Sequence, residues 1–268
     1  MTMMTTDECF LSVYGTLRRH PWLSADDQEI DAYGLFTTYS EALRWSTSAT
    51  YPRDSGPIPV DPMREFAMWA MNEAGGNWSD DVKDTADHLL WVQTGLDSAS
   101  RHIGLPITQI SHCAGKVLDR IGRVSLEGIQ AMLPIGRTVT PRPEWFRGVL
   151  ALANPENSTL LQVEIDGGED ETLIRNSTQI IDELNSSCQR DRMQFTAPIV
   201  DRSSFYLLSE PEAMDRTGWM GPSRGRIRAQ VSVPEFSLDL FSYLVNYLAR
   251  SCRIAGVNGS ILTTMRLA

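Results

Sequence analysis

Residues 227–267 read IRAQVSVPEFSLDLFSYLVNYLARSCRIAGVNGSILTTMRL and contain three consecutive elements of secondary structure. Apolar and polar residues alternate from Ile227 to Val233, which is the two-residue period of a half-buried strand. Apolar residues then recur at spacings of three and four from Leu238 to Cys252, the spacing of an amphipathic helix. Ser260–Leu267 predicts a second strand. The stretch therefore predicts a strand, helix, strand unit whose helix packs on a sheet.

A similar unit is predicted upstream. Phe146 to Ala153 and Leu160 to Ile165 flank the turn residues Asn154-Pro155-Glu156-Asn157 and predict a β-hairpin. An apolar stripe from Leu173 to Cys188 predicts a helix, and the acidic residues that precede it suit a helix N-terminus. Met193–Val200 and Phe205–Ser209 are expected to return as strands.

A third unit is predicted in the first half of the chain. Leu89–Thr94 predicts a strand, residues 107–121 carry a helical apolar stripe, and Val124–Leu133 predicts another strand. Gly128 interrupts the alternation of that last strand, which indicates a β-bulge.

These recurring units predict an α+β fold with two pseudo-repeated two-layer lobes, each a mainly antiparallel or mixed sheet with helices packed on one face. Residues 134–145 hold three prolines and Gly136, so we expect a connector there. The N-terminal lobe is then 1–133 and the C-terminal lobe 146–268. One continuous domain is the alternative.

Composition narrows the classes of protein to consider. The net charge of −10 over 268 residues disfavours nucleic-acid binding, which depends on basic residues that neutralise phosphates. We expect neither a membrane segment nor a signal peptide, because no long apolar run is present. The four cysteines form no CxxC pair, so reduced, buried thiols are expected. An acidic, soluble, cytoplasmic protein is the resulting expectation.

Catalytic and cofactor signatures are absent from the sequence. It contains no Gly-x-Ser-x-Gly elbow, phosphate-binding loop or dinucleotide fingerprint. The four histidines lack the spacing that places two imidazoles on one helix face, so no metal and no cofactor are expected. Whether the protein is an enzyme stays open, because many active sites have no local motif.

Histidines of the first half suggest one candidate site. His112 precedes Cys113, and Asp84 would lie one helical turn from His88 if that segment were helical. A packed thiol and a surface ion pair are the ordinary explanations. A pocket in the N-terminal lobe remains the alternative site, formed by His88, His102 and His112.

The segment 216–226, RTGWMGPSRGR, is the most unusual composition in this acidic chain. Glycines let backbone amides converge, arginines neutralise an anion, and an exposed tryptophan offers an apolar contact. An ordinary loop with a core tryptophan is the alternative. The candidate residues for binding a partner or an anion are Arg216, Gly218, Trp219, Gly221, Arg224 and Arg226.

The leading functional hypothesis is a non-catalytic protein-interaction protein, such as an adaptor, a chaperone-like protein or an inhibitor, with a protein partner. The alternative is a small-molecule-binding protein or an enzyme with its pocket in the N-terminal lobe.

Overall fold

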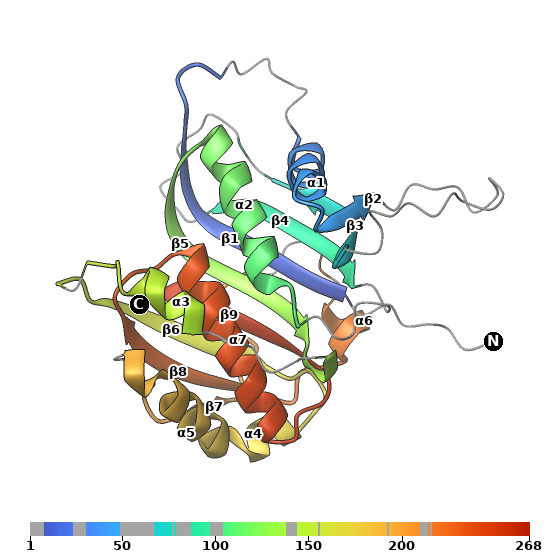
Figure 1. The fold of residues 1–268 in the computed structure, drawn as a ribbon. Coiled ribbons are helices and arrows are strands. Elements are labelled where there is room, and N and C mark those ends of the chain that lie inside the picture. Colours follow the sequence, from blue (N-terminus) through green and yellow to red (C-terminus); the bar gives the residue numbers. More distant parts are fainter. Residues whose placement is uncertain are drawn as a thin grey trace, which may run out of the picture.

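The computed structural model describes residues 8–23, 31–48, 67–76, 78, 87–96, 104–137, 144–154, 156–191, 193–209, 214 and 216–268. Within these residues the protein is a mixed α/β structure with one nine-stranded mixed sheet and seven α-helices (Figure 1). None of the helices in the described part of the chain is long and apolar enough to span a membrane.

The strands in chain order are β1 (Glu8–Arg19), β2 (Ser46–Ser48), β3 (Trp69–Gly75), β4 (Asp87–Leu96), β5 (Gly122–Pro134), β6 (Thr159–Asp166), β7 (Ile199–Asp201), β8 (Arg226–Val233) and β9 (Ser260–Leu267). The helices are α1 (Ala32–Ala42), α2 (Ile107–Ile121), α3 (Glu144–Leu150), α4 (Thr172–Arg175), α5 (Ser177–Cys188), α6 (Arg216–Met220) and α7 (Leu238–Ile254).

The strands lie side by side in the order β2-β3-β4-β1-β5-β9-β6-β8-β7. Neighbours are antiparallel except for the parallel pair β2 and β3. We expected a sheet in each half of the chain, but one sheet spans both. The reason is that β5 and β9, the last strands of the two halves, pair with each other from Gly128 to Pro134.

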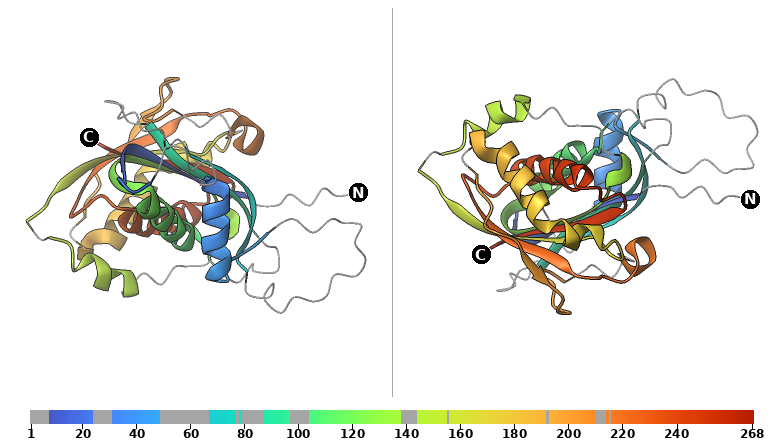
Figure 2. Two further views of the ribbon diagram at one scale, coloured as in Figure 1. Left: turned by 90° about the horizontal axis from the view of Figure 1, so that it is seen from above. Right: turned by 90° about the horizontal axis from the view of Figure 1, so that it is seen from below.

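Helices α1, α2, α7 and α5 cover one face of the sheet in a single layer (Figures 1 and 2). Their packing follows that order, with α2 against both α1 and α7, and α7 against α5. The predicted C-terminal helix is confirmed as α7, which is capped by Ser237 where its hydroxyl accepts the Leu240 N–H at 3.1 Å. Apolar side chains of the sheet and helices form one buried cluster that includes Val13, Leu161 and Leu244.

Three predicted strands differ from the structure. Phe146–Ala153 was expected to be a strand, but α3 and a turn occupy it, because its apolar residues also fit a helical spacing of three and four. Met193–Val200 forms a strand only at β7, with an isolated bridge from Phe195 to Val231. Phe205–Ser209 lies outside any strand.

The bulge expected at Gly128 is confirmed. The β1–β5 register shifts between Tyr14 and Gly15, which lie opposite Gly128 and Leu126. The expectation of free thiols is confirmed as well, since all four cysteines are buried and unpaired. Burial raises the pKa of Cys9 and of Cys252 to about 12, so both stay neutral thiols near pH 7.

Candidate functional site

The face of the sheet opposite the helix layer, called here the second face, carries a row of polar side chains. Five consecutive strands each contribute one residue, and each residue lies directly opposite the next. From β1 to β8 they are Ser12, Gln130, Thr264, Glu164 and Arg228. The first four are at most 1% exposed. Buried polar groups in such numbers require partners, which makes this row the most unusual feature of the sheet.

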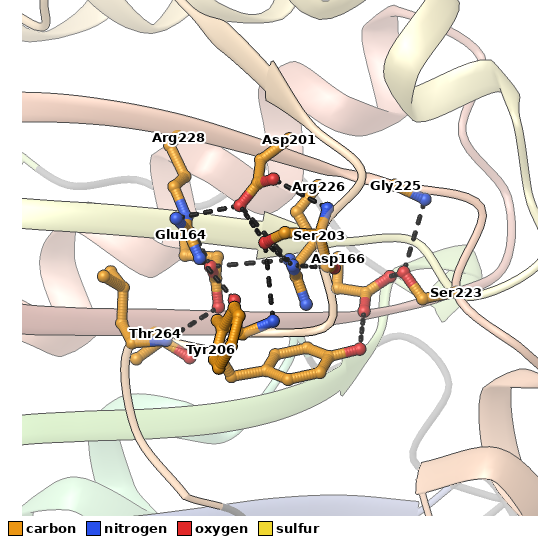
Figure 3. A network of polar contacts seen from close by, with 12 residues as sticks. Glu164, Asp166, Asp201, Ser203, Tyr206, Ser223, Gly225, Arg226, Arg228 and Thr264 are labelled. Atoms are coloured by element: carbon orange, nitrogen blue, oxygen red, sulfur yellow. Dashed lines mark hydrogen bonds and ion pairs between the residues drawn. The ribbon is translucent and has the colours of Figure 1, made fainter.

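Acidic and basic side chains of the second face form one ion-pair network (Figure 3). Glu164 accepts a hydrogen bond of 2.7 Å from Nε of Arg228, and Nε of Arg226 lies 3.5 Å from the same oxygen. Asp201 at the end of β7 contacts Nη1 of Arg228 at 2.8 Å and Nη2 of Arg226 at 3.5 Å. Two arginines of β8 are therefore held between carboxylates on β6 and β7, the strands on either side of it.

Asp166 extends the network toward the end of β6. Tyr206 donates its hydroxyl to Oδ2 of Asp166 at 3.0 Å, and Ser223 donates to Oδ1 at 3.0 Å. The guanidinium of Arg226 lies over the Tyr206 ring, 4.0 Å from its centroid, a cation–π geometry. Hydrogen bonds from the backbone N–H and the hydroxyl of Ser203, together with the arginines, lower the pKa of Asp201, so this carboxylate stays ionised at neutral pH.

Residues 203–209, called here the strap, cross the second face without joining the strand ladder. Every second residue, from Ser203 to Ser209, has its carbonyl oxygen hydrogen-bonded by a side chain of the sheet. In order along the strap, the donors are Arg226, Arg228, Arg266 at 3.2 Å and Tyr14 at 2.6 Å. These donors stand on β8, β9 and β1, so the strap runs from one half of the sheet to the other.

Two further contacts fix the strap between these donors. The backbone N–H of Leu207 donates to Oε1 of Glu164 at 3.4 Å. Leu208 is buried against Gly128, where an added Cβ would lie 2.6 Å from Cδ1 of the leucine. The glycine that forms the bulge therefore also makes room for the leucine of the strap.

The predicted recognition segment 216–226 is divided between surface and interior. Arg224 and Gly218 are exposed, whereas Arg226 is 1% exposed because it lies on the second face beneath the strap, where it binds the Ser203 carbonyl. Gly221 has φ of 69°, and a Cβ there would lie 2.9 Å from the Glu169 carboxylate. The side chain of Arg216 is outside the described residues. The five predicted residues whose side chains are described thus do not share one surface.

Trp219 is half-buried in a small apolar cluster on the second face. It belongs to α6 and packs against Phe10 of β1, with ring centroids 6.2 Å apart. Met214 and Met220 are buried in the same cluster. The sequence left two alternatives for Trp219, an exposed contact residue or a core residue. The half-buried side chain lies between the two.

The two histidines of the alternative pocket that the structure describes, His88 and His112, do not come together. His88 lies on β4 at the second face, where Nε2 is 2.6 Å from the Ser12 hydroxyl and the ring stacks on Tyr14 at 5.0 Å. His112 is exposed on α2, in the helix layer, and its ring meets the edge of Trp45 at 5.8 Å. His102 lies outside the described residues. His88 is in a strand, so the condition for a helical pairing with Asp84 is not met at His88, and Asp84 lies outside the described residues.

Sequence reasoning missed Glu164, Asp166, Arg228 and Arg266. A signal was present, because polar residues alternate along Gln162–Asp166 with acidic members and along Arg226–Gln230 with basic members. Opposite charges on two strands of matching period favour cross-strand pairing. Among the described residues no group of three or more side chains has the arrangement of a metal site.

Apolar side chains are exposed at the edge of the sheet formed by β7. Ile199 is 68% exposed, Val200 40%, and Phe205, at the start of the strap, 77%. Ile199 lies directly opposite Arg228, which also binds the carbonyl of Phe205, so both residues lie next to the same arginine. No protein-family model, curated protein or solved structure matches the chain.

Proposed function

We propose that this chain is a non-catalytic protein-interaction protein that binds an extended segment of a partner protein at the β7 edge. The observation that carries the proposal is the exposure of Ile199, Val200 and Phe205, by 68%, 40% and 77%, at the end of the sheet. An edge strand offers backbone groups for pairing with another chain, and apolar side chains beside it add contact area. The net charge of −10 favours a partner with a basic surface.

The ionisable groups of the second face support binding rather than catalysis. Glu164 and Asp201 are paired with arginines, and the lowered pKa of Asp201 suits a permanent charge better than proton transfer near neutral pH. We expect these groups to hold the sheet and the strap in shape. Four unpaired, buried thiols support a reducing compartment such as the cytoplasm.

We also infer that the two lobes proposed from the sequence, 1–133 and 146–268, are copies of one βαββαβ unit. Strand order supports this, because β3-β4-β1-β5 in the first half matches β7-β8-β6-β9 in the second. Under this match Gln130 corresponds to Thr264, and Ser12 corresponds to Glu164. The charged network and the β7 edge would then be features that the second copy acquired.

One observation favours a second candidate function, a small-molecule-binding protein or enzyme. The Ser12 hydroxyl lies 2.6 Å from Nε2 of His88, the arrangement in which an imidazole activates a serine. Gln130 lies directly opposite Ser12, and its Oε1 is buried without a hydrogen-bond partner among the described residues. Labelling with a fluorophosphonate tests this function. Modification of Ser12 that His88→Gln abolishes would support it, and an unlabelled Ser12 would reject it.

Site-specific photo-crosslinking in the native host tests the interaction function. The photoreactive residue p-benzoylphenylalanine replaces Phe205 in one variant and Leu152, which is 86% exposed on the turn after α3, in the control. We expect position 205 to give an adduct with one discrete protein that Ile199→Lys suppresses. Position 152 should give no such adduct. No adduct at 205, or the same adducts at both positions, would reject the β7 edge as the binding site.

A further inference from the structure

We propose that the second face is itself a binding surface for an extended peptide, that the strap occupies it within the same chain, and that a segment of the partner replaces the strap. This inference rests on the proposed function: the partner first contacts Ile199 and Phe205 at the β7 edge, and its segment then takes the place of the strap on the second face, while the Phe205 side chain keeps its contact with the partner. It follows from how the strap is held, since side chains rather than a strand ladder bind it.

Backbone recognition is the first argument. The four sheet donors bind carbonyl oxygens at alternate strap residues, the period at which an extended chain presents its carbonyls to one side. Any extended segment supplies the same acceptors, whatever its side chains. The surface therefore selects an extended backbone first, and a segment of a partner satisfies Arg226, Arg228, Arg266 and Tyr14 as well as the strap does.

Two strap side chains define the sequence preference. Tyr206 donates to Asp166, and Leu208, two residues later, is buried over Gly128. Both point toward the sheet, as residues i and i+2 of an extended chain do. The segment that best replaces the strap thus carries a hydrogen-bond donor such as tyrosine and a leucine-sized residue in Tyr-x-Leu spacing.

Accessibility is the third argument. Ser203, Ser204, Phe205 and Ser209 are exposed, so the strap is a single layer with solvent on its outer side. Glu164 and Arg226 beneath it are each 1% exposed and contact each other. Loss of the strap would leave these groups without their backbone partners, whereas exchange for another extended segment restores the contacts. Replacement is therefore favoured over simple opening.

A labelled peptide with the sequence of residues 202–209, Arg-Ser-Ser-Phe-Tyr-Leu-Leu-Ser, tests the exchange by fluorescence anisotropy. The full chain with Leu208→Ala has a loosened strap and an unchanged sheet surface. We expect the peptide to bind this variant about tenfold more tightly than the wild type, because the competing strap is weakened. A control peptide with serine in place of Tyr206 and Leu208 should bind at least about tenfold more weakly.

Adding Arg266→Met to the Leu208→Ala variant should weaken peptide binding again, because it removes one of the side chains that donate to a peptide carbonyl. The proposal would be overturned if the peptide bound wild type and Leu208→Ala with equal affinity. It would also be overturned if Arg266→Met left the affinity of the Leu208→Ala variant for the peptide unchanged. If Leu208→Ala does not fold, Tyr206→Phe weakens the strap at the hydrogen bond to Asp166 instead. Ile199→Lys should leave peptide binding unchanged, because the peptide binds the second face and not the β7 edge. The peptide assay therefore tests the second-face site independently of the crosslinking test of the β7 edge.

Discussion

Nε of Arg226 lies 3.5 Å from Oε2 of Glu164, and both side chains are almost fully enclosed beneath the strap. Replacing one partner of such a buried pair leaves an uncompensated charge. Arg226→Met should therefore lower the free energy of unfolding by about 3–5 kcal/mol. Arg224→Met, two residues earlier and exposed, should change it by less than about 0.5 kcal/mol. Urea denaturation measures both variants, and equal midpoints would contradict the burial of Arg226.

Acid should weaken the network through Asp201. Its pKa is lowered in the folded protein, first by the Ser203 backbone N–H and also by Arg228 and Arg226. A lowered folded pKa contributes stability above the unfolded value of about 3.9, and this contribution is lost as the pH falls through the folded value. The difference in urea midpoint between wild type and Asp201→Asn should thus be largest at neutral pH and shrink below about pH 4. A difference independent of pH would show that Asp201 is not held by these contacts.

The helix layer depends on the buried stripe of α7. Leu244 is fully buried in the core cluster, whereas Ile254 at the end of the same helix is 48% exposed. Leu244→Ala should cost about 2–5 kcal/mol of unfolding free energy, as buried large-to-small substitutions do. Ile254→Ala should cost clearly less. Guanidinium denaturation measures both variants. Similar losses of unfolding free energy for Leu244→Ala and Ile254→Ala would show that the stripe of α7 does not pack on the sheet.

Trp219 is a useful probe of α6, because it is half-buried against Phe10. Trp219→Ala should cost about 1–3 kcal/mol, less than the roughly 3–5 kcal/mol of a fully buried aromatic residue. Thermal unfolding measures the loss. An unchanged melting temperature would show that Trp219 does not pack against Phe10. It would instead support an exposed Trp219, as the sequence-based hypothesis of a recognition loop requires.

Local patterns predicted the parts of the fold that depend on neighbouring residues. The spacing of Leu238 to Cys252 and of residues 107–121 identified α7 and α2 correctly. The single sheet depends on the pairing of β5 with β9, between residues more than one hundred positions apart, and no local period encodes that partner choice. Phe205–Ser209 is a short run of aromatic and apolar residues that suits a strand, yet side chains bind its carbonyls, so pattern alone could not place it.

The candidate site was predictable only in part. Arg226 was selected from the sequence for its charge. In the structure it lies on the second face beneath the strap, whose Ser203 carbonyl it binds, so its side chain is buried. The exposed group at Ile199 and Phe205 combines a strand end with a strap residue, and only the folded sheet brings them to one arginine.

The affinity for the protein crosslinked at position 205 tests the proposed function most directly. Titration calorimetry compares wild type, Phe205→Ser and the control Leu152→Ser. We predict that Phe205→Ser weakens binding by about 2 kcal/mol or more, the scale of an interface hot spot, with an unchanged melting temperature. Leu152→Ser should bind as the wild type does. Equal affinity of Phe205→Ser and wild type would contradict the assignment of the β7 edge as the partner-binding site.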